Sequence, residues 1–444
     1  MNFLPRNGYY KRILHIALPA IAGLSSQMIV SIVDAAIVGR LGNSEYALAA
    51  MGIGVLATWV IVSFLSSLAT GTHILVARRY GEHDLESCSN IFNNSLLLGF
   101  FLGIIITLLG MMFADDFAQL LAKDHTVGDL AGEFIFYRVI GIPFFLITVS
   151  FRGFLFGIGN TRIFMFSAIL VNVLNIVFNY IFVYGKLGMP AMGVAGSGLG
   201  SSLATICDAA YYFIVTSFSS HRRNFSLYRN IRIDTSLIRS IFSLSLPVSF
   251  QNIFILIGFL SFVAITGLIG TVEQAASQAV ISALFLSFLP TYGFGIAVQT
   301  LVGNNIGKGK MQLAKIFGFE TAKIATYYTS FLALIFIFFP ELILIIITTN
   351  KEIIDVAIPA LRIAGFAQVF YSYGVVLANG LQSMGKTKYV MYAEVFANLI
   401  LFVPFAYIAG VVYRGGLSIA WMGLNLYVIV YTIFITYEFK KAKI

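Results

Sequence analysis

The chain has 444 residues, of which 59% are hydrophobic and only 11% are charged. Soluble globular domains carry about 25% charged residues, so this composition excludes an ordinary soluble protein. A membrane crossing takes about 20 apolar residues, and a chain of this length accommodates about twelve crossings joined by short loops. We therefore expect an all-α, multi-pass membrane protein.

Apolar runs bounded by charges or by Gly, Pro and Asn predict twelve transmembrane helices. In chain order they cover residues 13–39, 46–76, 88–113, 128–156, 163–185, 193–218, 238–268, 274–305, 312–349, 353–382, 388–413 and 416–438. The first run is too long for the h-region of a signal peptide and lacks an Ala-x-Ala site, so we expect it to remain as a helix. Pro19 lies inside it and removes a backbone donor, which gives this helix a place to bend.

Basic residues concentrate in alternate loops. The richer set carries Lys11/Arg12, Arg78/Arg79, Arg162, Arg222/Arg223/Arg229/Arg232, Lys308/Lys310/Lys315, Lys386/Lys388 and Lys440/Lys441/Lys443. The positive-inside rule places these loops, and with them both termini, in the cytoplasm. We expect the chain in a bacterial inner membrane. This distribution accounts for the net charge of +9, so we expect the lipid bilayer and no nucleic acid as a partner.

The two halves of the chain share motifs at one nearly constant offset. The residues Leu-Val and Gly of segment 75–81 recur in segment 301–307, and Gly159 recurs as Gly385. Several separated matches at one offset indicate an internal duplication. A chain that holds both halves of a transport unit is expected to work as a monomer.

The duplication predicts two lobes of six helices each. We assign residues 1–218 to an N-terminal lobe, 219–235 to a cytoplasmic linker and 236–444 to a C-terminal lobe. Because each half has an even number of spans, the halves share an orientation, and their pseudo-twofold axis should lie along the membrane normal. Two like bundles of this kind are typical of alternating-access transporters.

Asp34 in the first helix is the leading candidate for function, because an acid at a helix centre costs about 2.5–3.5 kcal/mol to insert. Gln27 and Ser31 precede it at helical spacing and share its face. One interpretation is a carboxylate that binds a proton or sodium ion. The other is a buried acid held by a structural partner. Beyond Na⁺ at Asp34 we expect no metal.

The fifth and sixth helices carry further polar side chains at helical spacing. They are Asn172, Asn175, Asn179, Ser201, Thr205 and Asp208. Hard cations bind such oxygens, but amides in membranes also hydrogen-bond between helices. Cavity-lining and purely structural roles therefore both remain open. Glu394 in the eleventh helix is a further intramembrane acid whose role the spacing does not assign.

Signatures of enzymes are missing from the sequence. The histidines show no metal-ligand spacing and no HExxH pattern, and no Walker A sequence occurs. We therefore expect a protein that is not an enzyme, has no cofactor, and uses an ion gradient rather than ATP.

Six segments together carry a resemblance to a known family. They are VDAAIVGRLG (33–42), LVARRYGEHD (75–84), RGFLFGIGNTR (152–162), NYIFVYGKLGMPAMGVAG (179–196), LVGNNIGKGK (301–310) and GLQSMGKTK (380–388). In this order they resemble the multidrug and toxic compound extrusion (MATE) family, and 179–196 resembles its norfloxacin-exporter branch. The resemblance covers essentially the whole chain.

The resemblance implies twelve helices in two lobes and export of amphipathic or cationic organic compounds in exchange for H⁺ or Na⁺. Asp34 falls on the family's first-helix carboxylate, and Asn175 and Asn179 fall on its polar fifth-helix positions. Two departures follow, because Ile255 and Tyr371 stand where the norfloxacin-exporter branch has acids in helices seven and ten. They favour coupling through Asp34 alone. The alternative is a flippase for lipid-linked precursors, which the scarcity of intramembrane Arg and Lys argues against.

Overall fold

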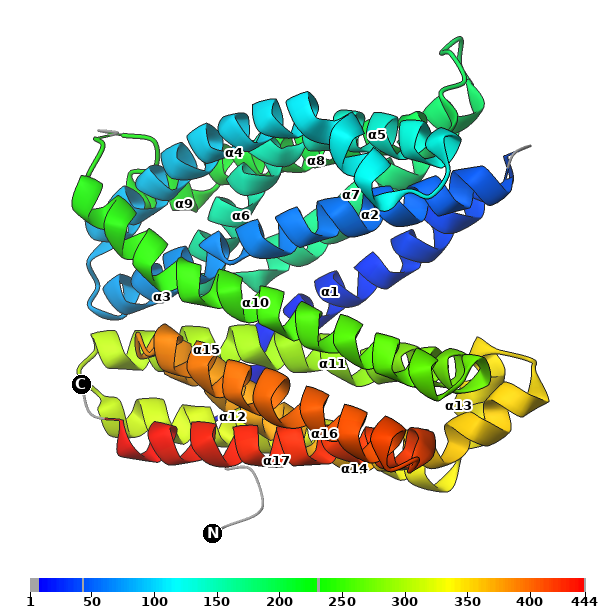
Figure 1. Ribbon diagram of the computed structural model, residues 1–444. Coiled ribbons are helices and arrows are strands. Elements are labelled where there is room, and N and C mark those ends of the chain that lie inside the picture. Colours follow the sequence, from blue (N-terminus) through cyan, green and yellow to red (C-terminus); the bar gives the residue numbers. More distant parts are fainter. Residues whose placement is uncertain (1–7, 42–43, 230–231, 443–444) are drawn as a thin grey trace. The chain divides into compact units, whose positions relative to one another are not determined.

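The computed structural model describes residues 8–41, 44–229 and 232–442, except for the side chains of residues 27–32, Ala35 and Ser44. Within these ranges the chain is helical and contains no strand (Figure 1). The helices are α1 (Tyr10–Val38), α2 (Ser44–Ser66), α3 (Leu68–Gly81), α4 (Leu85–Leu121), α5 (His125–Val139), α6 (Ile142–Gly157), α7 (Thr161–Tyr184), α8 (Gly193–Phe218), α9 (Ser220–Phe225), α10 (Thr235–Ile269), α11 (Thr271–Gly307), α12 (Met311–Phe338), α13 (Pro340–Ile347), α14 (Lys351–Ser383), α15 (Thr387–Val395), η1 (Phe396–Phe402), α16 (Val403–Tyr407), η2 (Ile408–Val412) and α17 (Gly416–Lys441).

These helices confirm the all-α membrane fold. Among the described residues, ten helical stretches are long and apolar enough to cross a membrane, and the bent pair α5 and α6 makes an eleventh. Helix α1, with 29 residues, coincides with the first predicted run. Each of the twelve predicted runs thus corresponds to a long helix or to a broken one.

Three predicted spans are interrupted, the second span at Ser67 between α2 and α3, and the other two at a proline. The fourth is bent by 48° between Val139 and Ile142, where Pro143 occupies the first turn of α6. The ninth ends at Phe338, and Pro340 opens the separate helix α13. Both proline breaks have the same cause, because proline lacks the N–H that a continuous helix needs and fits the first turn of a new one.

One compact unit comprises Ala22–Ser249. In this unit α7 packs along α8, and α6 packs against α3 and α4. Glycines allow the closest approaches. A Cβ on Gly196 would lie 2.6 Å from the backbone of Phe182, so α8 crosses α7 with backbones nearly touching. Small residues serve this purpose in membrane helix packing, where van der Waals contact replaces the hydrophobic effect between helices.

The other unit comprises the described residues of Met1–Ile21 and Phe250–Ile444. Helix α14 packs against α11, α12 and α17 and forms its centre. The first turns of α1 belong to this unit, since the Arg12 guanidinium lies 5.6 Å from the centroid of the Phe317 ring.

The two units exchange short segments relative to the lobes expected from the sequence. Residues 1–21 group with the second half, and residues 236–249 group with the first. Both division points lie just after a proline inside a helix, Pro19 in α1 and Pro247 in α10. A helix that bends at proline can direct its two parts into different packing environments.

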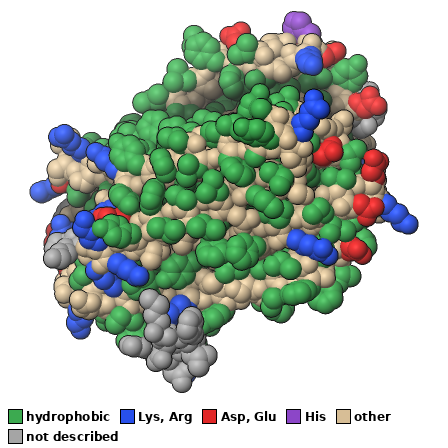
Figure 2. Space-filling view, turned by 60° about the horizontal axis from the view of Figure 1, so that its bottom comes forward, with side chains coloured by type: hydrophobic (Ala, Val, Ile, Leu, Met, Phe, Trp, Pro, Cys, Tyr) green, Lys and Arg blue, Asp and Glu red, His purple; other side chains and the backbone are tan. Residues whose placement is uncertain are grey.

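The surface is that of a membrane protein. On the face shown in Figure 2, hydrophobic side chains dominate, and charged side chains lie mostly at the margins. Large apolar side chains such as Leu108, Met112 and Phe331 are more than half exposed. Such a surface is suited to lipid rather than water. The chain is a multi-pass membrane protein.

Candidate functional site

The candidate carboxylate in α1 is held by an amide from α7. Asn179 Nδ2 donates a hydrogen bond of 2.7 Å to Asp34 Oδ1. Asn179 is completely buried, whereas Asp34 is only partly buried. Asp34 therefore combines a fixed hydrogen-bond donor with access from outside the helix packing, which a binding carboxylate requires.

A chain of polar groups continues from this contact into α8. Asn179 Nδ2 lies 3.3 Å from Asn175 Oδ1, and Asn175 Nδ2 donates to Ser201 Oγ at 2.8 Å. This series of hydrogen-bonded side chains links α1, α7 and α8 through a carboxylate, two amides and a hydroxyl. The structure brings together four of the residues expected from the sequence: Asp34, Asn175, Asn179 and Ser201.

Helical spacing and one glycine explain this arrangement. Asn175 and Asn179 are one turn apart and share a face of α7. Opposite them, a Cβ on Gly200 of α8 would lie 2.3 Å from Asn179 Oδ1. Only glycine at this position leaves room for the amide between the two helices.

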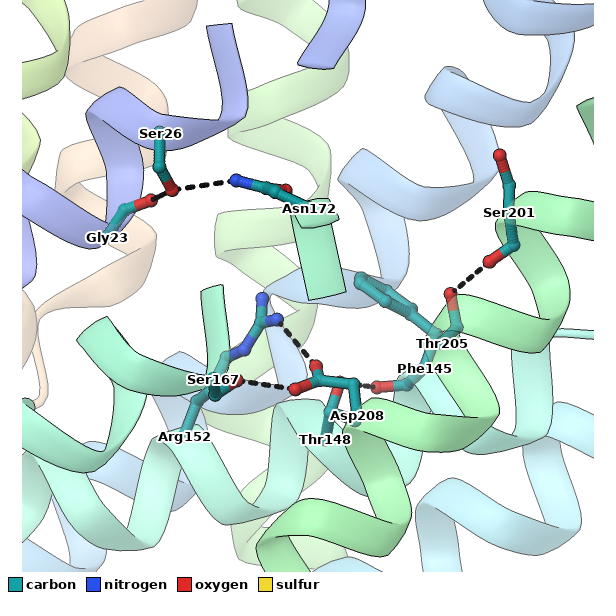
Figure 3. Close-up of polar contacts among 10 residues, drawn as sticks. All are labelled: Gly23, Ser26, Phe145, Thr148, Arg152, Ser167, Asn172, Ser201, Thr205 and Asp208. Atoms are coloured by element: carbon teal, nitrogen blue, oxygen red, sulfur yellow. Dashed lines mark hydrogen bonds and ion pairs between the residues drawn. The ribbon is translucent and has the colours of Figure 1, made fainter. Parts of the chain in front are cut away.

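Asn172 and Thr205 make other contacts. Asn172 Nδ2 donates to Ser26 Oγ at 2.8 Å, and the Ser26 hydroxyl donates to Gly23 O at 2.7 Å (Figure 3). Thr205 Oγ1 donates to Ser201 O within its own helix at 2.9 Å (Figure 3). Asn172 therefore joins α7 to α1 about two helical turns away from Asp34, while Thr205 satisfies its hydroxyl locally.

Asp208 belongs to a separate, buried cluster. Arg152 Nη2 of α6 lies 3.3 Å from Asp208 Oδ2, and the Ser167 hydroxyl of α7 donates to Asp208 Oδ1 (Figure 3). The Arg152 guanidinium also lies 5.1 Å from the centroid of the Phe164 ring. Asp208 is only 2% exposed. This geometry matches a buried ion pair that holds α6, α7 and α8 together.

Arg138 of α5 is a functional candidate that sequence reasoning missed. It acts electrostatically on Asp34 and lines a void of about 20 Å³ together with Thr58 and Thr205. A void of this size holds about one water molecule. With Arg138 nearby, the site is close to neutral when Asp34 is ionised and positive when Asp34 is neutralised. In the sequence Arg138 looks like any arginine near a helix end whose side chain extends to the membrane surface. No motif there indicates that it acts on Asp34.

The remaining candidates lie on α1. The side chains of Gln27 and Ser31 fall outside the described part of the structure. Pro19 is inside the helix, as expected. Among the described residues, no group of three or more His, Cys, Asp or Glu side chains could hold a metal ion.

The fold and this site define a multi-pass helical membrane protein with a polar cluster set among the helices of one unit. The family model MatE matches residues 19–181 and 247–408, one segment in each half of the sequence. The chain belongs to the MatE family. Members of this family are membrane transporters rather than enzymes.

Curated relatives match over nearly their whole length. The chain is 26% identical over 428 residues to a probable multidrug resistance protein NorM of Thermotoga maritima, covering 95% of this chain and 91% of the relative. It is 27% identical to the protein of the same name in Photorhabdus laumondii, covering 94% and 92%.

Solved structures share the fold. A MOP-superfamily transporter from Pyrococcus furiosus superposes with a TM-score of 0.88 at 23% identity, covering 97% of this chain and 95% of that one. A multidrug resistance MATE transporter in an outward-facing conformation also gives 0.88 at 23% identity, covering 99% and 100%.

Proposed function

We propose that the chain is a secondary antiporter that exports small amphipathic or cationic organic compounds in exchange for H⁺ or Na⁺ by alternating access. The observation that carries this proposal is the contact between Asp34 and Asn179. It places one ionisable group, oriented by an amide, at the end of a polar chain within a helical bundle. The names of the relatives, which are probable multidrug resistance proteins, favour a drug exporter over a flippase.

The proposed cycle uses the charge of Asp34. When Asp34 is ionised, Asn179 Nδ2 donates to it and the carboxylate attracts a cationic substrate. Binding of H⁺ or Na⁺ from outside removes this negative charge, and Arg138 then makes the site positive and expels the substrate. The bend that Pro19 permits in α1 accompanies this change. The loaded protein opens inward, loses the ion and binds substrate again.

One carboxylate provides enough energy for useful export. Moving one charge inward across about 150 mV supplies about 3.5 kcal/mol. This free energy corresponds to a substrate gradient of about 300-fold for a neutral compound. Coupling through a single site is therefore sufficient for a neutral compound. For a monovalent cation the one-for-one exchange moves no net charge, and the concentration gradient of H⁺ or Na⁺ alone drives export.

We further propose that the chain is a monomer in the inner membrane with both termini in the cytoplasm. In the unit that contains both ends of the chain, Lys315 Nζ donates to Lys440 O at 2.6 Å, and Arg12 packs on Phe317 two residues away. The start of α1 and the end of α17 therefore lie at the same end of this unit. The concentration of Lys and Arg there agrees with a cytoplasmic location.

Expression in a host that lacks its own exporters tests the proposed function. We expect the chain to permit growth on ethidium or norfloxacin and to lower ethidium accumulation, because export opposes entry. Growth on neither compound, combined with rescue of an envelope defect, would instead support a flippase.

Asn179→Ala should weaken binding of a coupling Na⁺ by about 10- to 100-fold, as loss of a ligand-orienting partner does at metal sites. If the coupling ion is H⁺, the same variant should bind it more tightly, because the amide donor stabilises the ionised carboxylate. The variant removes the donor to Asp34 and the contact to Asn175. The measurement is the dependence of export on H⁺ or Na⁺ concentration in vesicles. Asn172→Ala is the matched control, since its amide bonds Ser26 on the same pair of helices. An unchanged ion dependence in Asn179→Ala would remove Asn179 from the site.

A further inference from the structure

A second acid is buried in the unit built mainly from the C-terminal half. Glu394 lies at the end of α15 and is 2% exposed. The Tyr427 hydroxyl of α17 donates to Glu394 Oε1 at 2.5 Å. Asn398, Gln251 and Tyr431 also lie close enough to interact with the Glu394 side chain. Among the described residues no Lys, Arg or His forms an ion pair with it. Glu394 is therefore surrounded by neutral groups, unlike Asp208, which has its arginine.

The helix changes from α-helical to π-helical geometry directly after Glu394. The π-helix η1 begins at Phe396, two residues after Glu394, and contains Asn398. Such widened turns occur mostly as single turns and frequently at functional sites. Asn398 is 2% exposed, yet its Oδ1 accepts a hydrogen bond from no described residue. The π-helical turn thus places the Asn398 Oδ1 atom, which can still accept a hydrogen bond, close in sequence to the buried Glu394 carboxyl.

A glycine on the facing helix makes room for this acceptor. A Cβ on Gly258 of α10 would lie 2.0 Å from Asn398 Oδ1. The other nearby acceptor, Gln251 Oε1, already accepts a hydrogen bond of 3.1 Å from Gln382 Nε2. One unused oxygen suits one O–H donor, whereas a hard metal cation takes six or more oxygen ligands. The free acceptor therefore fits a protonated carboxyl rather than a bound metal ion.

Further tyrosines lie near the acid, and one of them is partly exposed. Tyr292 of α11 and Tyr371 of α14 interact with each other, and both interact electrostatically with Glu394. Tyr292 is 43% exposed. The titratable groups that face Glu394 from the surrounding described helices are these two residues together with Tyr427 and Tyr431. Their hydroxyls offer a route along which a proton can exchange with water.

We propose that Glu394 is a second proton-binding site of the transporter, in the compact unit that does not contain Asp34. On protonation the carboxyl gains one H⁺ from water by way of the tyrosine hydroxyls and donates it to Asn398 Oδ1. On release the carboxylate is held by Tyr427, Tyr431 and Gln251. The role of this site in coupling rests on the proposed export function, whereas its binding of a proton does not.

Infrared difference spectroscopy of the purified protein across a pH titration tests the site independently of transport. We expect a carboxyl C=O band that appears as the pH falls, persists in Asp34→Asn and is lost in Glu394→Gln. Glu341→Gln is the control, because Glu341 is an exposed acid in α13. A Glu394 band that is constant at every pH, or no band assignable to Glu394, would overturn the proposal.

Tyr427→Phe keeps the ring and removes the donor, so it serves if Glu394→Gln does not fold. It should shift the Glu394 band, whereas Tyr437→Phe, at a residue that is 63% exposed on the same helix, should not. An unshifted band in Tyr427→Phe would contradict the site. In vesicles, the number of protons exchanged per ethidium should fall by one in Glu394→Gln. If wild type moves no ethidium while the band still titrates, the export function fails and the proton site stands.

Discussion

Asp34→Asn is expected to abolish drug resistance and gradient-driven export while leaving the protein folded. The substitution keeps the size of the side chain and its ability to accept from Asn179 Nδ2, which lies 2.7 Å away in the wild type. It removes the negative charge on which both ion binding and attraction of a cationic substrate depend. Because a neutral amide does not exchange H⁺ or Na⁺ at this position, the variant loses the step that links ion binding to release of the substrate from the Asp34 site.

The measurement is ethidium accumulation in an exporter-deficient host that expresses each variant at an equal level. Asp34→Asn should accumulate ethidium like cells without the transporter. Asp116→Asn, at an exposed acid in α4, should export like the wild type. Full export by Asp34→Asn would show that Asp34 is a buried structural acid and that coupling occurs elsewhere.

Arg152→Met should produce the largest loss of stability, about 3–5 kcal/mol in the free energy of unfolding. The reason is that Asp208, at 2% exposure, would keep a buried charge without its partner 3.3 Å away. The measurement is reversible unfolding in mixed detergent micelles. Arg79→Met is the matched control, since it breaks the exposed pair with Glu82 and should cost about 0–1 kcal/mol.

The double variant Arg152→Met with Asp208→Asn separates pairing from packing. Removing both charges should recover much of the loss, because the main penalty in the single variant is an uncompensated buried carboxylate. If Arg152→Met costs no more than Arg79→Met, the pair does not hold the three helices together.

Much of the fold follows from composition and loop charge. A run of apolar residues long enough to span lipid has few alternatives to a helix, because every backbone group must be satisfied internally. Asp34 stood out in the sequence as an intramembrane acid, and the family resemblance, rather than the spacing, assigned Asn179 to the same site. The order of motifs along the chain was enough to indicate the family.

Other features depend on packing that no local pattern records. Arg152 and Asp208 are 56 positions apart, and nothing in either segment indicates that they pair. The free acceptor of Asn398 arises from a π-helical turn opposite Gly258, and the sequence around it is ordinary apolar helix. Likewise Pro19 indicates a bend in α1, but not that residues before Ala22 group with the second half of the chain.

Ion-driven uptake of ethidium into inside-out vesicles tests the central claim most directly. Vesicles containing the wild-type protein are given an imposed proton or sodium gradient in the absence of ATP, with an ionophore to collapse it. The proposed mechanism predicts uptake that follows one of the two gradients and stops when that gradient is collapsed. Uptake that continues without either gradient, or that requires ATP, would contradict an antiporter coupled through Asp34.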